Sequence, residues 1–227
     1  MASGVTMSEL FLNIGTGLRW LGIAALPLLL LPLLTLVLPK MFAAPANWLR
    51  PKLDAISSAT LGLSMSLAIF MVGVQILVIV GRYLFDWSAS WANDLIIYSF
   101  AGMFLLAAGS ALKHDAHVRV DILRESMSTD RRAAVDLAGL YLFLFPICLL
   151  IIWSSVSPSF VRSWANFEGA RETDGLPITY IFKTLVPLFG ILLTLQGLSE
   201  GLRAALTLRG SSSDIDTKSP QGVTDGN

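Results

Sequence analysis

Five stretches of this chain contain no Asp, Glu, Lys or Arg, and they limit the fold more than any other feature. They are residues 20–39, 55–81, 95–112, 137–161 and 184–199. A helix needs about 20 mainly apolar residues to cross the hydrocarbon core of a bilayer. The first four stretches meet that length directly. The last one meets it if the helix extends back through residues 177–182 and Lys183 snorkels or faces protein.

The composition agrees with a membrane protein. Of the 227 residues, 54% are hydrophobic and 14% are charged, whereas an ordinary soluble domain has about a quarter of its residues charged. We therefore predict an all-α, polytopic membrane helix bundle. Up to five spans are expected, at about residues 18–39, 57–82, 92–113, 135–157 and 177–203.

The first of these spans has three competing interpretations. Prolines interrupt its leucine-rich run, so it is a kinked spanning helix, an interfacial or re-entrant segment, or a cleaved signal peptide. We favour the spanning helix. A signal peptide is disfavoured because no basic residue precedes Arg19.

Lys and Arg residues between the predicted spans fall into two alternating groups. One group is Lys40, Arg50, Lys52, Lys113, Arg119, Arg124, Arg131, Arg132, Arg203, Arg209 and Lys218, and the other is Arg19, Arg82, Arg162, Arg171 and Lys183. Cytoplasmic segments carry the excess of basic residues in membrane proteins. We therefore expect the larger group and the carboxy terminus in the cytoplasm and, with five spans, the amino terminus in the periplasm.

Three regions follow from this organisation. Residues 1–52 form an N-terminal hydrophobic segment and a cytoplasmic linker, and residues 53–206 form a four-helix membrane domain. Residues 207–227 form a disordered cytoplasmic tail, because the sequence after Gly210 cannot bury enough apolar surface to fold.

Several function classes are disfavoured by the residues that the chain offers. The 16 basic and 16 acidic residues balance, so we expect no nucleic-acid partner. The single cysteine, Cys148, forms no internal disulfide, and His114 and His117 with Asp121 make too small a ligand set for zinc. We expect neither a metal, a cofactor nor catalytic residues.

Polar residues inside the predicted spans are few. Gln75 and Gln196 are the conspicuous ones, and an amide left unpaired in lipid is costly. We expect each to hydrogen-bond within the bundle or to a partner helix, which makes Gln75 a candidate structural or subunit-interface residue.

Aromatic rings accompany the segments on the predicted periplasmic side. Trp87 and its neighbours fit an interfacial aromatic belt, and docking of an extracytoplasmic partner is the alternative. The candidate docking residues are Trp87, Ser90, Glu168, Arg171 and Glu172.

Four sequence segments resemble a known family. They are GRYLFDWSASWANDL (81–95), ALKHDAHVRVDIL (111–123), SWANFEG (163–169) and DGLPITYIFKTLVPLFG (174–190). In order and placement they are similar to the small membrane subunit, of the DctQ type, of tripartite ATP-independent periplasmic (TRAP) transporters. The resemblance covers residues 53–205, so four helices are family-like and the N-terminal one is additional.

The resemblance implies a subunit of a bacterial inner-membrane importer. A periplasmic substrate-binding protein would capture an organic acid, a large membrane subunit would move it with a sodium gradient, and this chain would brace the large subunit. Recurring motif positions of the family correspond to Arg82, Trp91, Asp94, His117 and Asp121, and Asp94 stands where the family often has Glu. These residues are candidate structural or interface residues.

Two other function classes remain as alternatives. A self-sufficient small transporter or channel would show internal repeats or broken helices around a midplane site, for which Pro146 and Pro187 are the only hint. A membrane-embedded enzyme or haem anchor would need convergent ligands at membrane depth, whereas the two histidines lie together at one membrane exit.

The topology leads to a direct prediction. Fusing a reporter that is active only in the periplasm to each end of the chain should give activity at the amino terminus and silence at the carboxy terminus. Activity at the carboxy terminus would overturn the orientation. Silence at the amino terminus would show that residues 18–39 do not span.

Overall fold

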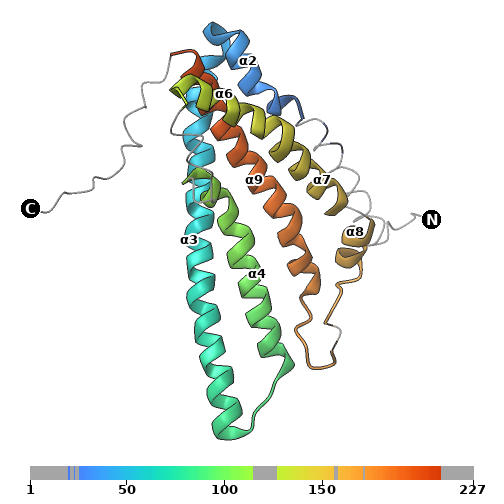
Figure 1. Cartoon of the computed structure of the whole chain (residues 1–227). Helices are drawn as coiled ribbons and strands as arrows, with labels where there is room; N and C mark the ends of the chain where they lie inside the picture. Colours follow the sequence, from blue (N-terminus) through green and yellow to red (C-terminus); the bar gives the residue numbers. More distant parts are fainter. Residues whose placement is uncertain are drawn as a thin grey trace, which may run out of the picture.

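The structure, a computed structural model, describes residues 20, 23, 26–114, 127–155, 158–170 and 172–210, and the regular elements within them are helices. In chain order they are α2 (Leu31–Val37), α3 (Pro39–Phe85), α4 (Ser90–Lys113), α6 (Thr129–Gly139), the π-helical turn η1 (Leu140–Leu144), α7 (Phe145–Ser155), α8 (Pro158–Ala165) and α9 (Thr179–Leu208). Figure 1 shows α3 and α4 side by side, with α9 next to α4 and α7 beyond α9.

Four helices in the described part of the chain are long and apolar enough to cross a membrane. They are Met41–Phe85, Ser90–Lys113, Thr129–Ser155 and Thr179–Leu208. These helices contain or closely match the predicted spans 57–82, 92–113, 135–157 and 177–203. The predicted fold class, an all-α polytopic helix bundle with four such helices and a further N-terminal one, is confirmed.

The first predicted span, 18–39, lies largely outside the described residues before residue 26. Its described part contains α2, which at 7 residues is too short to span a bilayer alone. Pro32 and Thr35 are buried, and Pro32 packs against the backbone of α9 at Gly201, where an added Cβ would lie 3.1 Å from the proline ring. The described end of this segment is thus part of the packed bundle, and whether the segment spans stays a prediction.

Helix α3 is much longer than a bilayer is thick. Its 47 residues correspond to about 70 Å, against about 30 Å for the hydrocarbon core. Pro45 and Pro51 lie inside the helix without ending it. The first turns of α3 therefore extend beyond the core, and the boundary that we placed between residues 52 and 53 falls inside a continuous helix.

The fourth predicted span, 135–157, contains a local irregularity next to Pro146. Pro146 has no N–H and its ring crowds the carbonyl group four residues earlier. The preceding residues, Leu140–Leu144, form a π turn, which places one more residue in the loop closed by each hydrogen bond. Helix α7 ends at Ser155, and Pro158, the residue just after the predicted span, begins α8.

The C-terminal half of α9 is the centre of the packing. Residues from Gln196 to Leu206 are mostly buried, and α2, α3, α4, α6 and α7 all contact α9. Gly197 permits a close approach, because a Cβ there would come within 2.5 Å of the Leu144 side chain. The core thus lies toward the end of the bundle where α3 begins and α9 ends.

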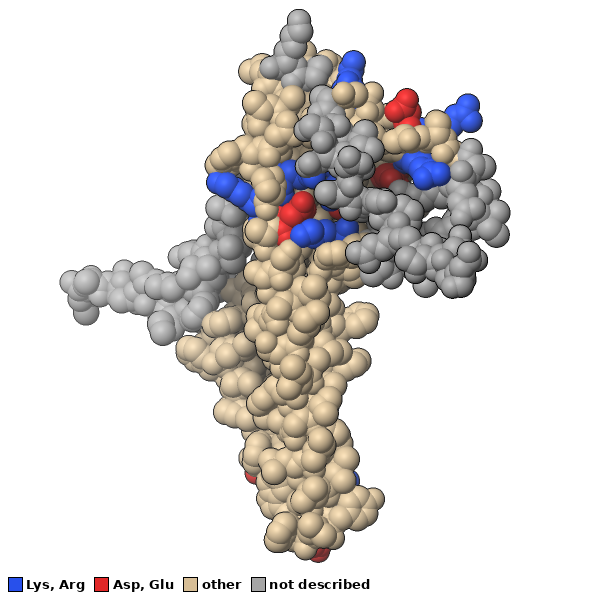
Figure 2. Space-filling view, turned by 90° about the vertical axis from the view of Figure 1, so that its left-hand side faces the viewer, with Lys and Arg blue, Asp and Glu red and all other residues tan. Residues whose placement is uncertain are grey.

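Charged side chains gather at that same end, which we call the charged end (Figure 2). Its described Lys and Arg residues on α3, α4, α6 and α9, and just after α9, are Arg50, Lys52, Lys113, Arg131, Arg132, Arg203 and Arg209. The opposite end, which we call the aromatic end, carries Arg82, Arg162 and Lys183. The members of the two groups of basic residues listed here therefore lie at opposite ends of the bundle.

Candidate functional site

Four polar side chains meet where α3 and α9 cross near the charged end, and we call them the interhelical polar cluster. They are Asp54, Ser57, Gln196 and Ser199. Asp54 and Ser57 are three residues apart on α3, and Gln196 and Ser199 are three residues apart on α9. This spacing places the two side chains of each helix on one face. Ser57 is 2% exposed, and Gln196 and Ser199 are fully buried.

Hydrogen bonds within the cluster engage both the oxygen and the nitrogen of the Gln196 amide. Ser57 Oγ donates to Gln196 Oε1 over 2.6 Å, and Gln196 Nε2 donates to Asp54 Oδ1 over 3.1 Å. Ser199 Oγ donates to the same Asp54 oxygen over 2.6 Å. Because a buried polar group is costly only when it lacks a partner, this network stabilises the crossing of α3 and α9.

Helix α4 is tied to the same crossing. Lys113 Nζ donates to the Asp54 carbonyl oxygen over 3.2 Å and to Ser58 Oγ over 2.8 Å. Gly109 allows the approach, since a Cβ there would lie 3.2 Å from Ser57 Oγ. Three of the four long helices therefore meet at one polar point.

At the aromatic end, two carboxylates cross-link the loop before α9 to the start of α4. Asp94 Oδ2 accepts the Leu176 N–H over 2.9 Å, and Asp174 Oδ2 accepts the Ser90 N–H over 3.2 Å. Gly175 lies against Asp94, because a Cβ at this glycine would come within 2.8 Å of Asp94 Oδ2. We call this reciprocal pair the loop latch, and it fixes the candidate docking residue Ser90 against the loop.

The two tryptophans predicted at this end pack on each other and on α3. Trp87 and Trp91 form an edge-to-face pair with ring centroids 5.8 Å apart. The Trp87 ring covers Gly81, where a Cβ would lie 2.6 Å from a ring carbon. Arg82 is exposed in the last turn of α3, where a cation favours the helix dipole.

The loop that carries the acidic docking candidates is held by α9. Glu168 pairs with Lys183, and both side chains are about two-fifths exposed. Trp164 Nε1 donates to Thr184 Oγ1 over 3.1 Å. Glu172 is exposed, and Arg171 lies outside the described residues.

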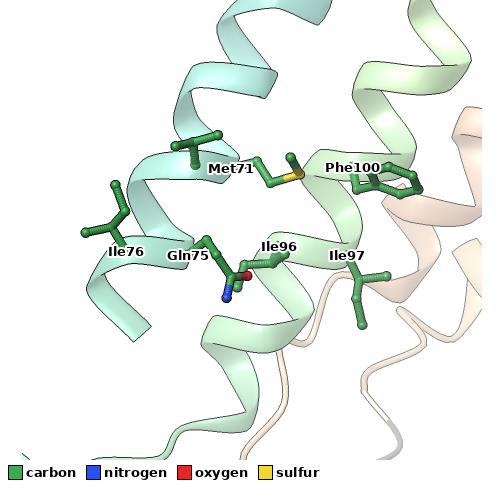
Figure 3. Close-up of a pocket in the computed structure, with 7 residues that line it drawn as sticks. Met71, Gln75, Ile76, Ile96, Ile97 and Phe100 are labelled. Carbon is green, nitrogen blue, oxygen red and sulfur yellow. The ribbon is translucent and has the colours of Figure 1, made fainter. Parts of the chain in front are cut away.

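Gln75 has a different environment from Gln196. It is exposed on α3 and lines a groove between α3 and α4 with Met71, Val72, Ile76, Ile96, Ile97 and Phe100 (Figure 3). Within the described residues the Gln75 amide has no hydrogen-bond partner. The described part of the bundle therefore leaves this amide without a partner inside an apolar, charge-free stretch.

The histidine segment is described only at its start. His114 Nδ1 lies 2.9 Å from the Ser110 carbonyl oxygen one turn earlier, while His117 and Asp121 lie outside the described residues. In the part of the chain that the structure describes, no group of three or more His, Cys, Asp or Glu side chains is arranged to hold a metal ion.

Two functional contacts were not singled out from the sequence. Asp54 and Asp174 were not among the candidates, although both contact residues that were noted. A sequence signal exists for Asp54, because Asp54 with Ser57 repeats the i, i+3 spacing of Gln196 with Ser199.

Comparison with known families gives one match. The family described as tripartite ATP-independent periplasmic transporters, DctQ component, matches residues 71–207, which is more than half of the chain. No curated protein and no solved structure gives a significant match.

The two glutamines give a matched test of the polar cluster. Gln196→Leu should lower the free energy of unfolding by about 1 to 3 kcal/mol, because it leaves the Ser57 hydroxyl and the Asp54 carboxylate short of a partner in a buried site. Gln75→Leu makes the same chemical change on an exposed face and should alter the stability of the isolated chain by less than about 0.5 kcal/mol. Denaturant titration of both variants in mixed micelles measures the difference, and equal stabilities would contradict a structural role for the cluster.

Proposed function

The chain belongs to the DctQ family, the small membrane component of tripartite ATP-independent periplasmic transporters, and we propose that it is the scaffold subunit of such a transporter. In this proposal it braces a large membrane subunit that imports an organic acid with a sodium gradient. A periplasmic binding protein delivers the acid. The complex resides in the bacterial inner membrane.

The observation that carries the scaffold role is the placement of charge. The charge-free stretches of α3, α4, α7 and α9 separate a charged end from an aromatic end, so the described residues offer no Asp, Glu, Lys, Arg or His side chain midway along the membrane helices. Ion and proton pathways through membranes usually use such groups. A bundle of this kind is better suited to hold a moving subunit than to conduct a substrate itself.

The polar contacts support a rigid bundle. The interhelical polar cluster joins α3, α4 and α9 at one end, and the loop latch joins α4 to the loop before α9 at the other. A transporter in which one part slides needs a second part that resists tilting. Bonds at both ends of the same helices provide that resistance.

Orientation follows from the basic residues. We assign the charged end to the cytoplasm, because it holds most of the described Lys and Arg residues. The aromatic end then faces the periplasm, with the carboxy terminus inside and the amino terminus outside. In this orientation Trp87, Ser90, Glu168, Arg171 and Glu172 are placed to meet the binding protein, whereas His117 and Asp121 are not.

The first test asks whether transport needs this chain. Cells with the binding protein and the large subunit should lose uptake of a radiolabelled organic acid that they otherwise import when this chain is deleted, and should regain it when the chain is restored. Uptake should be lost because the large subunit then lacks the scaffold that resists tilting while its moving part slides. Normal uptake in the deletion strain would refute the proposal, and uptake by the purified chain alone would favour a self-sufficient transporter.

The second test concerns docking at the aromatic end. Glu168→Lys with Glu172→Lys should weaken association of the binding protein with the purified membrane complex by up to about tenfold, because each exposed charge contact contributes about 0 to 1 kcal/mol. Association should also become more sensitive to salt, which screens charges over about 8 Å at physiological ionic strength.

Two controls separate docking from other effects of these substitutions. Lys183→Ala removes the ion pair with Glu168 without reversing an acidic charge, and Asp130→Lys reverses a charge at the opposite end of the bundle. Both should retain docking, as should His117→Ala. Undiminished association in the double reversal, or lost association in His117→Ala with assembly unchanged, would refute the assignment.

A further inference from the structure

Helix α3 is the least covered of the four long apolar helices in the described part of the chain, and it lies along α4. Only 11% of the most apolar stretch of α3 is buried, against 33% for α4 and α9. The groove between α3 and α4 has a volume of about 360 Å³. Val72, Ile76, Ile97 and Phe100 on its walls are each more than half exposed.

Gln75 lies at hydrocarbon depth in this groove. It is seven residues before Arg82, a distance of about 10 Å along the helix, and it falls within the charge-free stretch 55–81. Figure 3 shows its side chain between α3 and α4 with Ile96 beside it. The remaining lining side chains are apolar, so nothing in the groove can hydrogen-bond to the amide.

We propose that the groove receives a transmembrane helix of the large membrane subunit, which presents a hydroxyl or amide side chain to Gln75 and aliphatic side chains to the surrounding walls. This inference rests on the proposed function. The inference adds to the proposed function the face of this chain that contacts the large subunit and the residue that fixes the depth of the partner helix.

The chemistry of the groove selects this occupant. A lipid tail matches the apolar walls but offers no donor or acceptor, so it leaves the amide unsatisfied at a cost of several kcal/mol in a hydrocarbon-like solvent. A neutral helix with one polar side chain satisfies both parts of the surface. The groove itself has no charged lining residue, so it calls for no charged partner.

The contact should depend on close packing and one polar bond. Helices in a bilayer gain little from the hydrophobic effect, because lipid is as apolar as their side chains, and they associate through packing and interhelical hydrogen bonds. Gln75 therefore sets the register of the partner helix, while the apolar walls supply shape.

The proposal is tested with the full chain and the large subunit expressed together. Gln75→Leu should weaken their association in detergent by about 3- to 20-fold, which corresponds to about 0.6 to 1.7 kcal/mol for one interhelical hydrogen bond. Ile97→Trp, which fills the groove, should also weaken it. Phe143→Trp is the matched control, because Phe143 is an exposed residue of η1 on another part of the bundle, and it should leave association unchanged.

A photo-reactive residue identifies the occupant in intact membranes. Placed at Ile97, it should give an adduct with the mass of this chain plus the large subunit, and placed at Leu150 on α7 it should not. An adduct of twice 24.6 kDa would mean that a second copy fills the groove, and lipid adducts alone would mean that lipid does; either overturns the proposal.

The outcomes also distinguish this inference from the proposed function. If the wild-type chain associates with the large subunit and Gln75→Leu associates equally well, the face is wrong and the scaffold role stands. If the wild-type chain does not associate with the large subunit at all, the scaffold role fails and the inference fails with it.

Discussion

The hydrocarbon core of a bilayer contains no water, so polar groups there must find hydrogen-bond partners within protein. The rest of the structure depends on this requirement. Backbone groups meet it by forming helices. Side chains meet it in two ways: charges stay at the two ends of the bundle, and the buried amide of Gln196 is enclosed by Ser57, Asp54 and Glu200. Because these partners come from both α3 and α9, satisfying one amide also fixes how two long helices cross.

The two ends of the bundle are held by different kinds of hydrogen bond. At the charged end, side chains bond to side chains across helices, which holds α3, α4 and α9 together. At the aromatic end, Asp94 and Asp174 each accept a backbone N–H from the other's segment, which holds a loop in one shape against α4. The first arrangement holds the helices together and the second fixes the shape of an exposed loop, and the scaffold proposed above, which also meets a soluble binding protein, would need both.

Much of the fold could be predicted from the sequence because charge-free length is a local property. The stretches 55–81, 95–112, 137–161 and 184–199 specified four spans without any knowledge of neighbours. Contacts between distant segments were not accessible in this way. Asp54 and Gln196 are 142 residues apart, and nothing local to either shows that they meet. Helix α8 was missed for a related reason: at 8 residues it is too short to give a membrane signal, and Pro158 indicated an end as readily as a beginning.

Gln75 and Gln196 illustrate why the sequence alone could not assign roles to polar residues in spans. Both are glutamines in apolar helices, and the same physical cost applied to both led us to expect a partner for each. The described part of the fold provides that partner for Gln196, which is fully buried, and provides none for Gln75, which is exposed. The first amide therefore belongs to the stability of this chain, whereas the second is left for something outside it. In the proposed scaffold role such a residue has a clear use, since one unsatisfied amide on an apolar face favours a helix with a complementary group over the lipid that would otherwise cover it.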